Sequence, residues 1–431
     1  MINLFLLTDA FPFGKGEDFI MNEVEYLSKK FEKIFIIPSG IMCDTSIRRQ
    51  LPENMIVLNP LNQENIYAEG NPSKSKRIIW GLRNMMIWVI CCFFQKCFYR
   101  ELFAEIKENG FSLKKIKYII RILSPCLRNI HHYKKDIQQE MFSSDTTIIY
   151  SFWFDYSQYM MSRIISKNKI KGDFIKVSRG HRHDIYVEES KYSYLPFRDL
   201  FFSNLDRLYI STRDGFTYMQ NKYPQHFDKI YLSYLGTKDH GYNGGKKRDV
   251  FRIVSCSLLS PVKRVDLIIE ALTQLPDMNI EWVHFGDGLL YEQIKELAKN
   301  KLKGHISYKF MGYTANDKML KYYEQNDIHL FINVSTSEGL PVSIQEAISF
   351  GYPIIATDVG STREAVISEY NGCLIDKDFQ ISKLVSCIKY LREISDEEYK
   401  KICLNSRKLW EDNFNANKLY DKFIDEISII C

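Results

Sequence analysis

The sequence lacks the features that mark membrane-spanning, disulfide-rich and zinc-binding proteins. The uncharged apolar stretch Met85–Phe94 is far shorter than the ~20 residues that a membrane-spanning helix needs. The ten cysteines form no CxxC pair and no Cys/His array at zinc spacing. The first residues, Met1–Leu7, are patterned like a strand rather than like a basic, cleavable leader. We therefore expect a cytoplasmic protein with reduced thiols.

The composition is otherwise that of a globular protein, and the length exceeds that of one compact domain. Hydrophobic residues make up 45% and charged residues 26% of the 431 positions. A chain of this length is expected to form two domains. The net charge of +5 is small and no nucleic-acid recognition motif is present, so no nucleic-acid partner is predicted.

Positive charge is nevertheless concentrated in one segment, residues 74–135. It holds 14 basic and 3 acidic side chains, a net charge of +11, together with aromatic residues at helical spacing. A basic, aromatic, helical segment can lie on an anionic membrane surface. It can equally be a helix of the core with solvated basic flanks, and the pattern favours neither interpretation. A break between two helices is expected near Asn109-Gly110.

The most informative stretch is Phe331–Gly372, where two strand–loop–helix units follow each other. An apolar run ends at Ile332, as a buried parallel strand does, and a polar loop leads to a helical pattern that ends at Phe350. A second strand, Ile354–Thr357, precedes another expected helix start near Thr362. Loops of this kind lie at the carboxyl ends of the strands of a parallel sheet, where ligands bind.

The first of these loops carries groups that suit a nucleotide-sugar. Pro341 fits the first turn of a helix, where unpaired N–H groups can bind a diphosphate. Gly339 allows the backbone to approach a ligand closely. Glu338 and Glu346 can accept hydrogen bonds from sugar or ribose hydroxyls. One such Glu alone indicates a helix cap or a solvated position, whereas the pair with Gly339 between them favours a binding site.

Glu338 and Glu346 form a Glu-x7-Glu pair within SEGLPVSIQEAISFGYPIIATDVGSTREAV. This stretch strongly resembles the donor-site signature of family 4 of the retaining glycosyltransferases, which have the GT-B fold. The nearest subgroup is the bacterial exopolysaccharide and capsular polysaccharide enzymes of the amylovoran and colanic acid type. The resemblance implies that Glu346 binds the nucleotide ribose and that Glu338 contacts the donor sugar. It assigns the phosphate and sugar oxygens to the backbone of Gly339, Leu340, Pro341 and Val342.

The start of the chain predicts a doubly wound half-domain. Strands Ile2–Leu7 and Lys33–Pro38 flank a helical pattern, Phe19–Phe31. The loop after the first strand contains Gly16, and in the family the matching loop faces the donor phosphates and the acceptor. The resemblance therefore makes Gly16 a donor-binding residue, although a plain turn explains this glycine equally well.

A second set of polar residues follows the expected strand Phe174–Ser178, within SRGHRHDIY. A histidine can donate a hydrogen bond to a sugar hydroxyl or a phosphate. The family has a His in a comparable Arg-x-His-Gly-x-Asp stretch, where it supports the transferring sugar, and His181 is the match. His183 is the alternative, because Arg182 stands where the family has Gly.

The second domain is expected to begin with strand Phe251–Ser257, followed by a loop that ends in Lys263 and Arg264. Cations at a strand–helix junction can neutralise a leaving diphosphate. The family carries an Arg early in this loop and a Lys at its end. Lys263 matches the Lys, but Ser257 stands at the Arg position. Two interpretations of Arg264 stay open: it supplies the missing charge, or it is a solvated cap.

Two further turns match places where the family holds the nucleotide. Gly286 lies in a GxG after a strand, a weak dinucleotide signal because the third Gly is absent. Tyr313 follows a later strand, where the family holds the base largely through its backbone. Asp376-Lys377-Asp378 resembles the Asp-x-Asp metal motif of the other glycosyltransferase fold, but so short a motif matches by chance and the GT-B family needs no metal. We therefore expect no metal and no cofactor, with the nucleotide-sugar as co-substrate.

Together these features predict an α/β protein of the GT-B fold, with two Rossmann-like doubly wound domains facing each other across a cleft. The expected domains are 1–240 for the acceptor, 241–415 for the donor, and a terminal helix, 416–431, that crosses back. The predicted activity is a retaining, metal-independent transfer of a hexose or N-acetylhexosamine, with His181, Lys263 and Glu338 as catalytic residues. The expected donor is a UDP-sugar and the acceptor a lipid-linked glycan or oligosaccharide of bacterial surface polysaccharide synthesis, at the inner face of the cell membrane.

Two other functions are compatible with parts of this pattern. A nucleotide-sugar epimerase or a phosphorylase can share the fold, although the paired Glu and the lack of a lysine suited to pyridoxal phosphate argue against them. A non-catalytic partner that binds a glycan or a membrane would have lost donor-site groups. All of those groups are present except the Arg that Ser257 replaces.

Overall fold

The computed structural model of the chain describes residues 2–14, 17–40, 48–60, 86–143, 146–246, 249–275 and 278–429. The chain divides into two compact units. The first unit comprises Met1–Ser211, Gly215–Ser233 and Tyr420–Cys431, and the second comprises Thr212–Asp214 and Tyr234–Leu419. The main boundaries thus lie at 233/234 and 419/420, where the sequence suggested 240/241 and 415/416.

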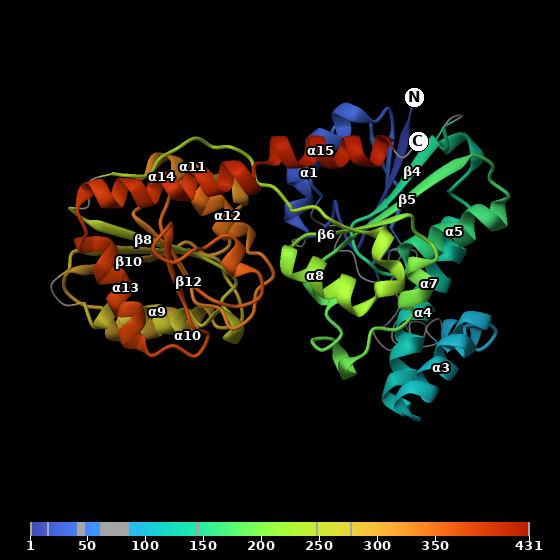
Figure 1. Ribbon diagram of the computed structural model, residues 1–431, viewed down its shortest axis with the longest axis horizontal. Coiled ribbons are helices and arrows are strands. Elements are labelled where there is room, and N and C mark those ends of the chain that lie inside the picture. Colours follow the sequence, from blue (N-terminus) through green and yellow to red (C-terminus); the bar gives the residue numbers. More distant parts are fainter. Residues whose placement is uncertain are drawn as a thin grey trace, which may run out of the picture. The chain divides into compact units, whose positions relative to one another are not determined.

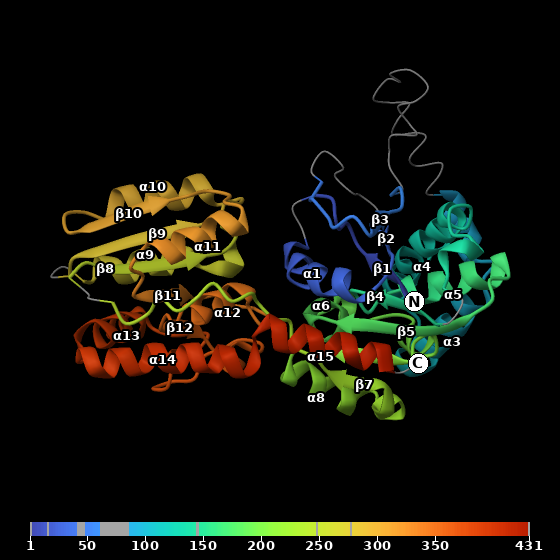
Figure 2. The ribbon, with the colours of Figure 1, turned by 90° about the horizontal axis from the view of Figure 1, so that it is seen from above.

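The first unit is built on a parallel sheet whose strand order is β3-β2-β1-β4-β5-β6-β7 (Figures 1 and 2). Its strands are β1 (Asn3–Thr8), β2 (Ile34–Pro38), β3 (Met55–Val57), β4 (Thr146–Ser151), β5 (Asp173–Gly180), β6 (Arg207–Ile210) and β7 (Ile230–Leu232). The central strands are apolar and buried on both faces, as expected of parallel strands covered by helices. The order reverses between β1 and β4, which is the switch point where such sheets bind ligands.

Helices cover both faces of this sheet (Figures 1 and 2). One face packs against α3 (Lys96–Asn109), α4 (Leu113–Tyr133), α5 (Ser157–Asn168), α7 (Arg198–Phe202) and α8 (Arg213–Lys222). On the other face lie α1 (Met21–Lys30) and the terminal helix α15 (Ala416–Ile429), where the Phe423 ring lies 5.3 Å from that of Tyr150. The C-terminal part of α15 therefore belongs to the first unit although its start lies in the second.

The second unit repeats the plan, with strand order β10-β9-β8-β11-β12-β13 and all pairs parallel. The strands are β8 (Phe251–Cys256), β9 (Ile280–Phe285), β10 (Ile306–Phe310), β11 (Leu330–Asn333), β12 (Ile354–Thr357) and β13 (Gly372–Ile375). One face packs against α9 (Val265–Thr273), α10 (Tyr291–Lys301) and α13 (Ile381–Glu393). The other packs against α11 (Asn316–Gln325), α12 (Val342–Ser349) and α14 (Asp396–Asn413). The switch point lies between β8 and β11.

The observed elements follow the sequence pattern closely, with two corrections. The helix expected to start near Thr362 is only one 3-10 turn, Thr362–Glu364, because the chain then turns back and Asn371 accepts a hydrogen bond from the Ile367 N–H. Pro341 does not occupy the first turn of α12; it is the extended residue that precedes Val342. The break between two helices in the basic segment is found at Gly110, which has a φ of +78°.

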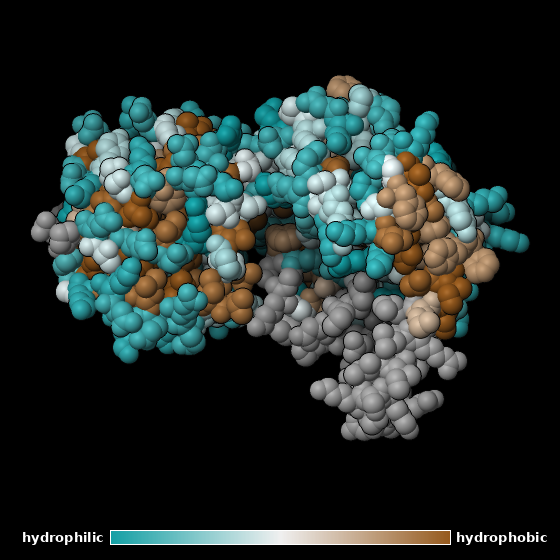
Figure 3. Space-filling view, turned by 90° about the horizontal axis from the view of Figure 1, so that it is seen from below, coloured by the Kyte–Doolittle hydropathy of each residue, from teal (hydrophilic) through white to brown (hydrophobic). Residues whose placement is uncertain are grey.

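Helices α3 and α4 and the residues before them carry an apolar surface on the first unit. Phe94, Phe111 and Phe103 are 79%, 70% and 64% exposed, and Met86, Ile90 and Leu113 also point into solvent. Figure 3 shows hydrophobic residues gathered on this side of the unit, at the right of the view. Among the described residues, no helix is long and apolar enough to cross a membrane.

Candidate functional site

The loops that follow β8 and β11 meet at the switch point of the second unit. Lys263, at the end of the β8 loop, places its Nζ 2.6 Å from Oε1 of Glu338 in the β11 loop. Asn333 donates to the same carboxylate oxygen at 3.1 Å. Both ionic side chains are mostly buried, with 23% and 11% of their surface exposed. The structure therefore brings two of the predicted catalytic residues into direct contact.

Arg264, the next residue, is directed away from this pair. Its Nε donates to the Val334 carbonyl at 2.8 Å, Nη1 donates to that of Lys377 at 2.8 Å, and Nη2 to that of Ser335 at 3.4 Å. The backbone of Arg264 has a φ of +47°, an uncommon value for a side chain of this size. The guanidinium thus holds three loop carbonyls, two of them at the start of the loop after β11.

The N-terminus of α12 lies at the end of the same loop and has no side-chain cap. The Pro341 carbonyl accepts from the N–H groups of Ile344 and Gln345 at 3.1 and 3.2 Å. The start of the helix therefore carries the partial positive charge of its dipole beside Glu338 and Lys263. The Gly339 carbonyl accepts from the Ser361 N–H at 3.0 Å, which joins this loop to the one after β12. The predicted Gly339–Val342 turn is therefore held by hydrogen bonds to α12 and to the loop after β12.

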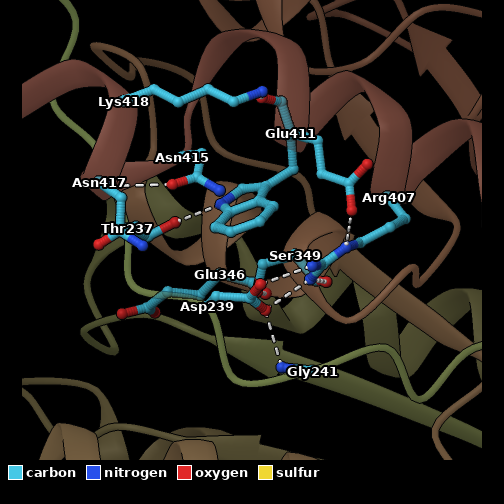
Figure 4. Close-up of polar contacts among 11 residues, drawn as sticks. Thr237, Asp239, Gly241, Glu346, Ser349, Arg407, Glu411, Asn415, Asn417 and Lys418 are labelled. Atoms are coloured by element: carbon cyan, nitrogen blue, oxygen red, sulfur yellow. Dashed lines mark hydrogen bonds and ion pairs between the residues drawn. The ribbon is translucent and has the colours of Figure 1, made fainter.

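Glu346 projects from the second turn of α12 into a buried position. Its carboxylate accepts a hydrogen bond from Asn316 Nδ2 at 2.7 Å, and only 6% of the surface of Glu346 is exposed. Burial with so few donors raises the pKa of the carboxyl to about 7 from its usual 4.5. The far end of α12 is anchored by Arg407, which donates to the Ser349 carbonyl at 2.6 Å and binds both oxygens of Asp239 (Figure 4).

Two further predicted donor residues lie in turns beside these loops. Gly286 has a φ of +135°, and a Cβ there would stand 1.9 Å from the Ser257 carbonyl oxygen, so only glycine fits. Its N–H donates to the Gly312 carbonyl at 3.0 Å, which brings the turn before Tyr313 next to it. The Tyr313 side chain is 53% exposed. The structure therefore places both turns at the carboxyl edge of the second sheet.

In the first unit, His181 follows β5 and is enclosed by aromatic rings. Its Nε2 lies 3.0 Å from the Phe152 carbonyl, so this nitrogen carries the proton. The ring stacks on Phe152 at 4.9 Å, and Trp153 lies 4.6 Å away. Burial, with Arg179 and His183 adding positive charge, lowers the pKa of His181 to about 3. A neutral imidazole with Nε2 bonded can offer Nδ1 as an acceptor to a substrate hydroxyl.

The charged neighbours of His181 in the sequence serve the fold. Arg179 is fully buried and contacts Glu23, Tyr150 and Ser233. Asp184 accepts from the His181 N–H at 2.6 Å and from the Phe154 N–H at 2.8 Å. The side chain of Arg182 pairs with Glu189. Of the two candidate histidines, only His183 is exposed, and its ring lies 4.6 Å from that of Trp153.

Sequence reasoning missed three partners of the predicted residues. Asn333 and Asn316 hold Glu338 and Glu346, and Trp153 lies between the two histidines. Asn333 ends a strand in the sequence, which is a usable signal, whereas Asn316 and Trp153 are brought near only by the fold. Gly16 lies outside the described residues. Within those residues, no group of three or more His, Cys, Asp or Glu could hold a metal ion.

Comparison with known proteins relates the second unit to glycosyltransferases. Residues 242–409 match the profile of the family described as Glycosyl transferases group 1. The chain is 26% identical over 158 residues to the amylovoran biosynthesis glycosyltransferase AmsK of Erwinia amylovora, covering 34% of this chain and 38% of that protein. It is 30% identical over 138 residues to the GtfA subunit of a UDP-N-acetylglucosamine–peptide N-acetylglucosaminyltransferase of Streptococcus agalactiae, covering 31% and 26% of the two chains. The chain spans less than half the length of the curated relatives it matches, with 26%, 30% and 42% covered in three of them.

Solved structures resemble the chain over nearly its whole length. Anabaena HepE in complex with UDP-glucose has a TM-score of 0.58 at 13% identity, with 99% of both chains covered. A glycosyltransferase of Rickettsia africae has a TM-score of 0.61 at 14% identity, with 100% of this chain and 98% of that one covered. These neighbours have the GT-B fold, so the prediction of two Rossmann-like parallel-sheet domains is confirmed.

Proposed function

We propose that this protein is a retaining glycosyltransferase of the family 4 type that transfers a hexose or N-acetylhexosamine from a UDP-sugar. The observation that carries the proposal is the Lys263–Glu338 pair beside the uncapped N-terminus of α12, with Glu346 on the same helix. A cation and a helix N-terminus together suit a diphosphate, and the two carboxylates suit hydroxyls. Relatives that act on UDP-sugars, and a fold neighbour with bound UDP-glucose, support the choice of nucleotide.

In the proposed reaction, each residue contributes binding or charge stabilisation. Glu346 would hold the ribose and Glu338 the sugar, while Lys263 and the α12 N-terminus would stabilise the departing diphosphate. These groups supply the positive charge that a metal supplies elsewhere, so we propose a metal-independent transfer with no cofactor. Neutral His181 would accept a hydrogen bond from a sugar hydroxyl through Nδ1. The acceptor hydroxyl would attack on the face from which the diphosphate leaves, giving retention of configuration.

We also propose that the acceptor is a lipid-linked glycan or oligosaccharide, reached at the inner face of the cell membrane. The exposed Phe94, Phe103 and Phe111 lie on the same helical segment as exposed Lys114 and Lys117. Apolar side chains flanked by cations suit an anionic lipid surface. The relative AmsK, named for amylovoran biosynthesis, supports a role in bacterial surface polysaccharide synthesis.

The test is product analysis with a panel of UDP-sugars, with and without a bacterial lipid extract as acceptor source. We expect UDP release and a glycosylated lipid whose new linkage keeps the anomeric configuration of the donor, determined by NMR. Glu338→Gln should remove the transfer while leaving the fold intact. Turnover of a UDP-sugar to another UDP-sugar without acceptor would instead identify an epimerase, and no turnover with any donor would favour a non-catalytic partner.

A further inference from the structure

The switch point of the first unit is bridged by a carboxylate of the chain itself. Glu17, in the β1–α1 loop, accepts hydrogen bonds from three consecutive backbone N–H groups, those of Asp9, Ala10 and Phe11, at 3.1, 2.7 and 2.6 Å. Its Oε1 also accepts from the Trp153 indole Nε1 at 2.6 Å, in the loop after β4. Successive N–H groups that converge in this way form a nest that binds anions. Here the anion is Glu17, which is only 8% exposed.

The backbone conformation of Glu17 indicates that its hydrogen bonds hold the residue in place. Its φ of +59° lies in the left-handed region, which a non-glycine residue occupies only where other contacts hold it there. Four charge-assisted hydrogen bonds provide such contacts and satisfy the buried charge. Glu17 therefore fills the anion-binding position of the first unit with a group that no solvent ion can easily replace.

The hydrogen bond between Glu17 and Trp153 also fixes the Trp153 ring beside His181 and His183. The Trp153 ring lies 4.6 Å from the rings of both His181 and His183, and Phe19 meets it edge-on at 6.0 Å. Trp153 and His181 are half-buried and His183 is exposed, so this surface is open on one side. It presents an aromatic ring and imidazole nitrogens, which suit an uncharged sugar, while the N–H groups of Asp9, Ala10 and Phe11 are already bonded to Glu17.

We propose that Glu17 is an internal anion that fills the switch-point nest of the first unit and positions Trp153 against His181. The unit then presents a binding surface for a neutral sugar and excludes a second phosphate. The proposal rests on the proposed glycosyltransferase function for its kinetic readout. Glu17 is a positioning residue in this scheme, because it acts through Trp153.

The first test follows the Trp153 indole directly, without any activity. Acrylamide quenching is measured for the wild type, Glu17→Gln and the matched control Glu25→Gln, whose carboxylate is exposed on α1. The Trp153→Phe variant supplies the background from the other tryptophans. We expect quenching of Trp153 to rise in Glu17→Gln and to stay at the wild-type level in Glu25→Gln. Wild-type quenching in Glu17→Gln would overturn the proposal.

The second test asks whether an added anion replaces the side chain. Glu17→Gly suits the left-handed backbone and empties the nest, so formate should restore low Trp153 quenching in this variant and leave the wild type unchanged. Inorganic phosphate is the competing probe. Thermal stabilisation of the wild type by phosphate that disappears in Lys263→Met would report the donor site, whereas stabilisation that persists there would show an open nest and overturn the proposal. Failure of formate to restore Glu17→Gly would do the same.

The third test reads catalysis as hydrolysis of UDP-N-acetylglucosamine or UDP-glucose, with water as acceptor. Loss of positioning should lower kcat of Glu17→Gln by roughly tenfold to 100-fold with an unchanged dissociation constant for UDP. Trp153→Phe keeps an aromatic ring but lacks the indole N–H, and it should also lower kcat. Equal losses of UDP affinity and kcat would overturn the positioning role. A wild type that neither binds UDP nor hydrolyses a UDP-sugar would refute the proposed function, while the quenching and formate measurements would still decide the role of Glu17.

Discussion

The Lys263 Nζ lies 2.6 Å from Oε1 of Glu338, and this ion pair joins the loops after β8 and β11 at the switch point of the second sheet. The first unit has a parallel arrangement, in which Glu17 joins the loops after β1 and β4 through a 2.6 Å hydrogen bond to Trp153. In both units a glutamate bridges the position where a doubly wound sheet binds ligands. The difference is the partner. In the second unit Glu338 pairs with a lysine beside the uncapped N-terminus of α12, whose N–H groups can bind a diphosphate, whereas in the first unit Glu17 already accepts hydrogen bonds from the N–H groups.

Replacing Lys263 should weaken binding of the diphosphate and spare the nucleoside. Lys263→Met removes one charged contact, worth about 1.5–3 kcal/mol, so affinity for UDP should fall roughly tenfold to 100-fold. Affinity for uridine should change little, because the lysine contacts no part of the base or ribose in this scheme. Isothermal titration with UDP and uridine makes the comparison. Lys377→Met, an exposed lysine of the same unit, is the control. Equal losses for both ligands would contradict the assignment.

Binding of UDP should depend on pH through Glu346. Burial raises the pKa of this carboxyl to about 7, so in the free protein it is protonated at pH 6 and ionised at pH 8. The ionised form accepts hydrogen bonds from ribose hydroxyls better, so affinity for UDP should rise between these values and level off above about pH 8. Glu346→Gln should bind UDP weakly with no such dependence. A wild-type affinity that is flat from pH 6 to 8 would refute this role.

The same carboxyl predicts the pH dependence of stability. Its pKa in the folded state lies above the unfolded value of 4.5, so folding favours the protonated form. The stabilisation is complete below pH 4.5 and is lost as the pH rises through 7. Urea denaturation should therefore show that the wild type loses stability relative to Glu346→Gln between pH 5 and 8. The opposite slope would mean that the carboxylate has donors that the structure does not show.

Much of the fold follows from the sequence because parallel strands are short apolar runs between helical patterns. Strand β12 was predicted with its observed ends, and Lys263 and Glu338 were each placed in a loop that follows a strand. The sequence could not separate the roles of two arginines that stand close to predicted site residues in the chain. Arg264 holds loop carbonyls and Arg179 is buried against Glu23, and only packing decides this. The role of Glu17 depends on Trp153, 136 residues away, which no local pattern reveals.

Removing Arg179 should destabilise the first unit strongly. Its guanidinium is fully buried, 3.4 Å from Glu23 and 4.1 Å from the centre of the Phe423 ring on α15. Arg179→Met leaves Glu23 buried without its partner, which should cost about 3–5 kcal/mol in urea denaturation. Lys30→Met, which breaks an exposed pair with Asp425, should cost less than about 1 kcal/mol. Similar values for the two variants would show that the buried Arg179–Glu23 pair contributes no more to stability than an exposed pair.

The basic, apolar surface of α3 and α4 should bind anionic vesicles. Neutralising Lys114, Lys117 and Arg121, all exposed, should weaken binding to phosphatidylserine-containing vesicles by about 1 kcal/mol for each charge. Lys115 is a poor choice for this test, because it pairs with Glu105. The control neutralises three exposed lysines of the second unit, Lys389, Lys400 and Lys401. Equal binding of all three proteins in flotation assays would favour a role of the segment in the core alone.

The most direct test of the account is a thermal-shift panel with UDP, GDP, ADP and CMP on the wild type and Glu346→Ala. A ligand at 100 times its dissociation constant stabilises the folded state by about 2.7 kcal/mol, which a melting curve resolves. We predict a shift that is selective for UDP and absent in Glu346→Ala. No shift with any nucleotide, or a UDP shift of equal size in the variant, would contradict the assignment of the second unit as the UDP-sugar site.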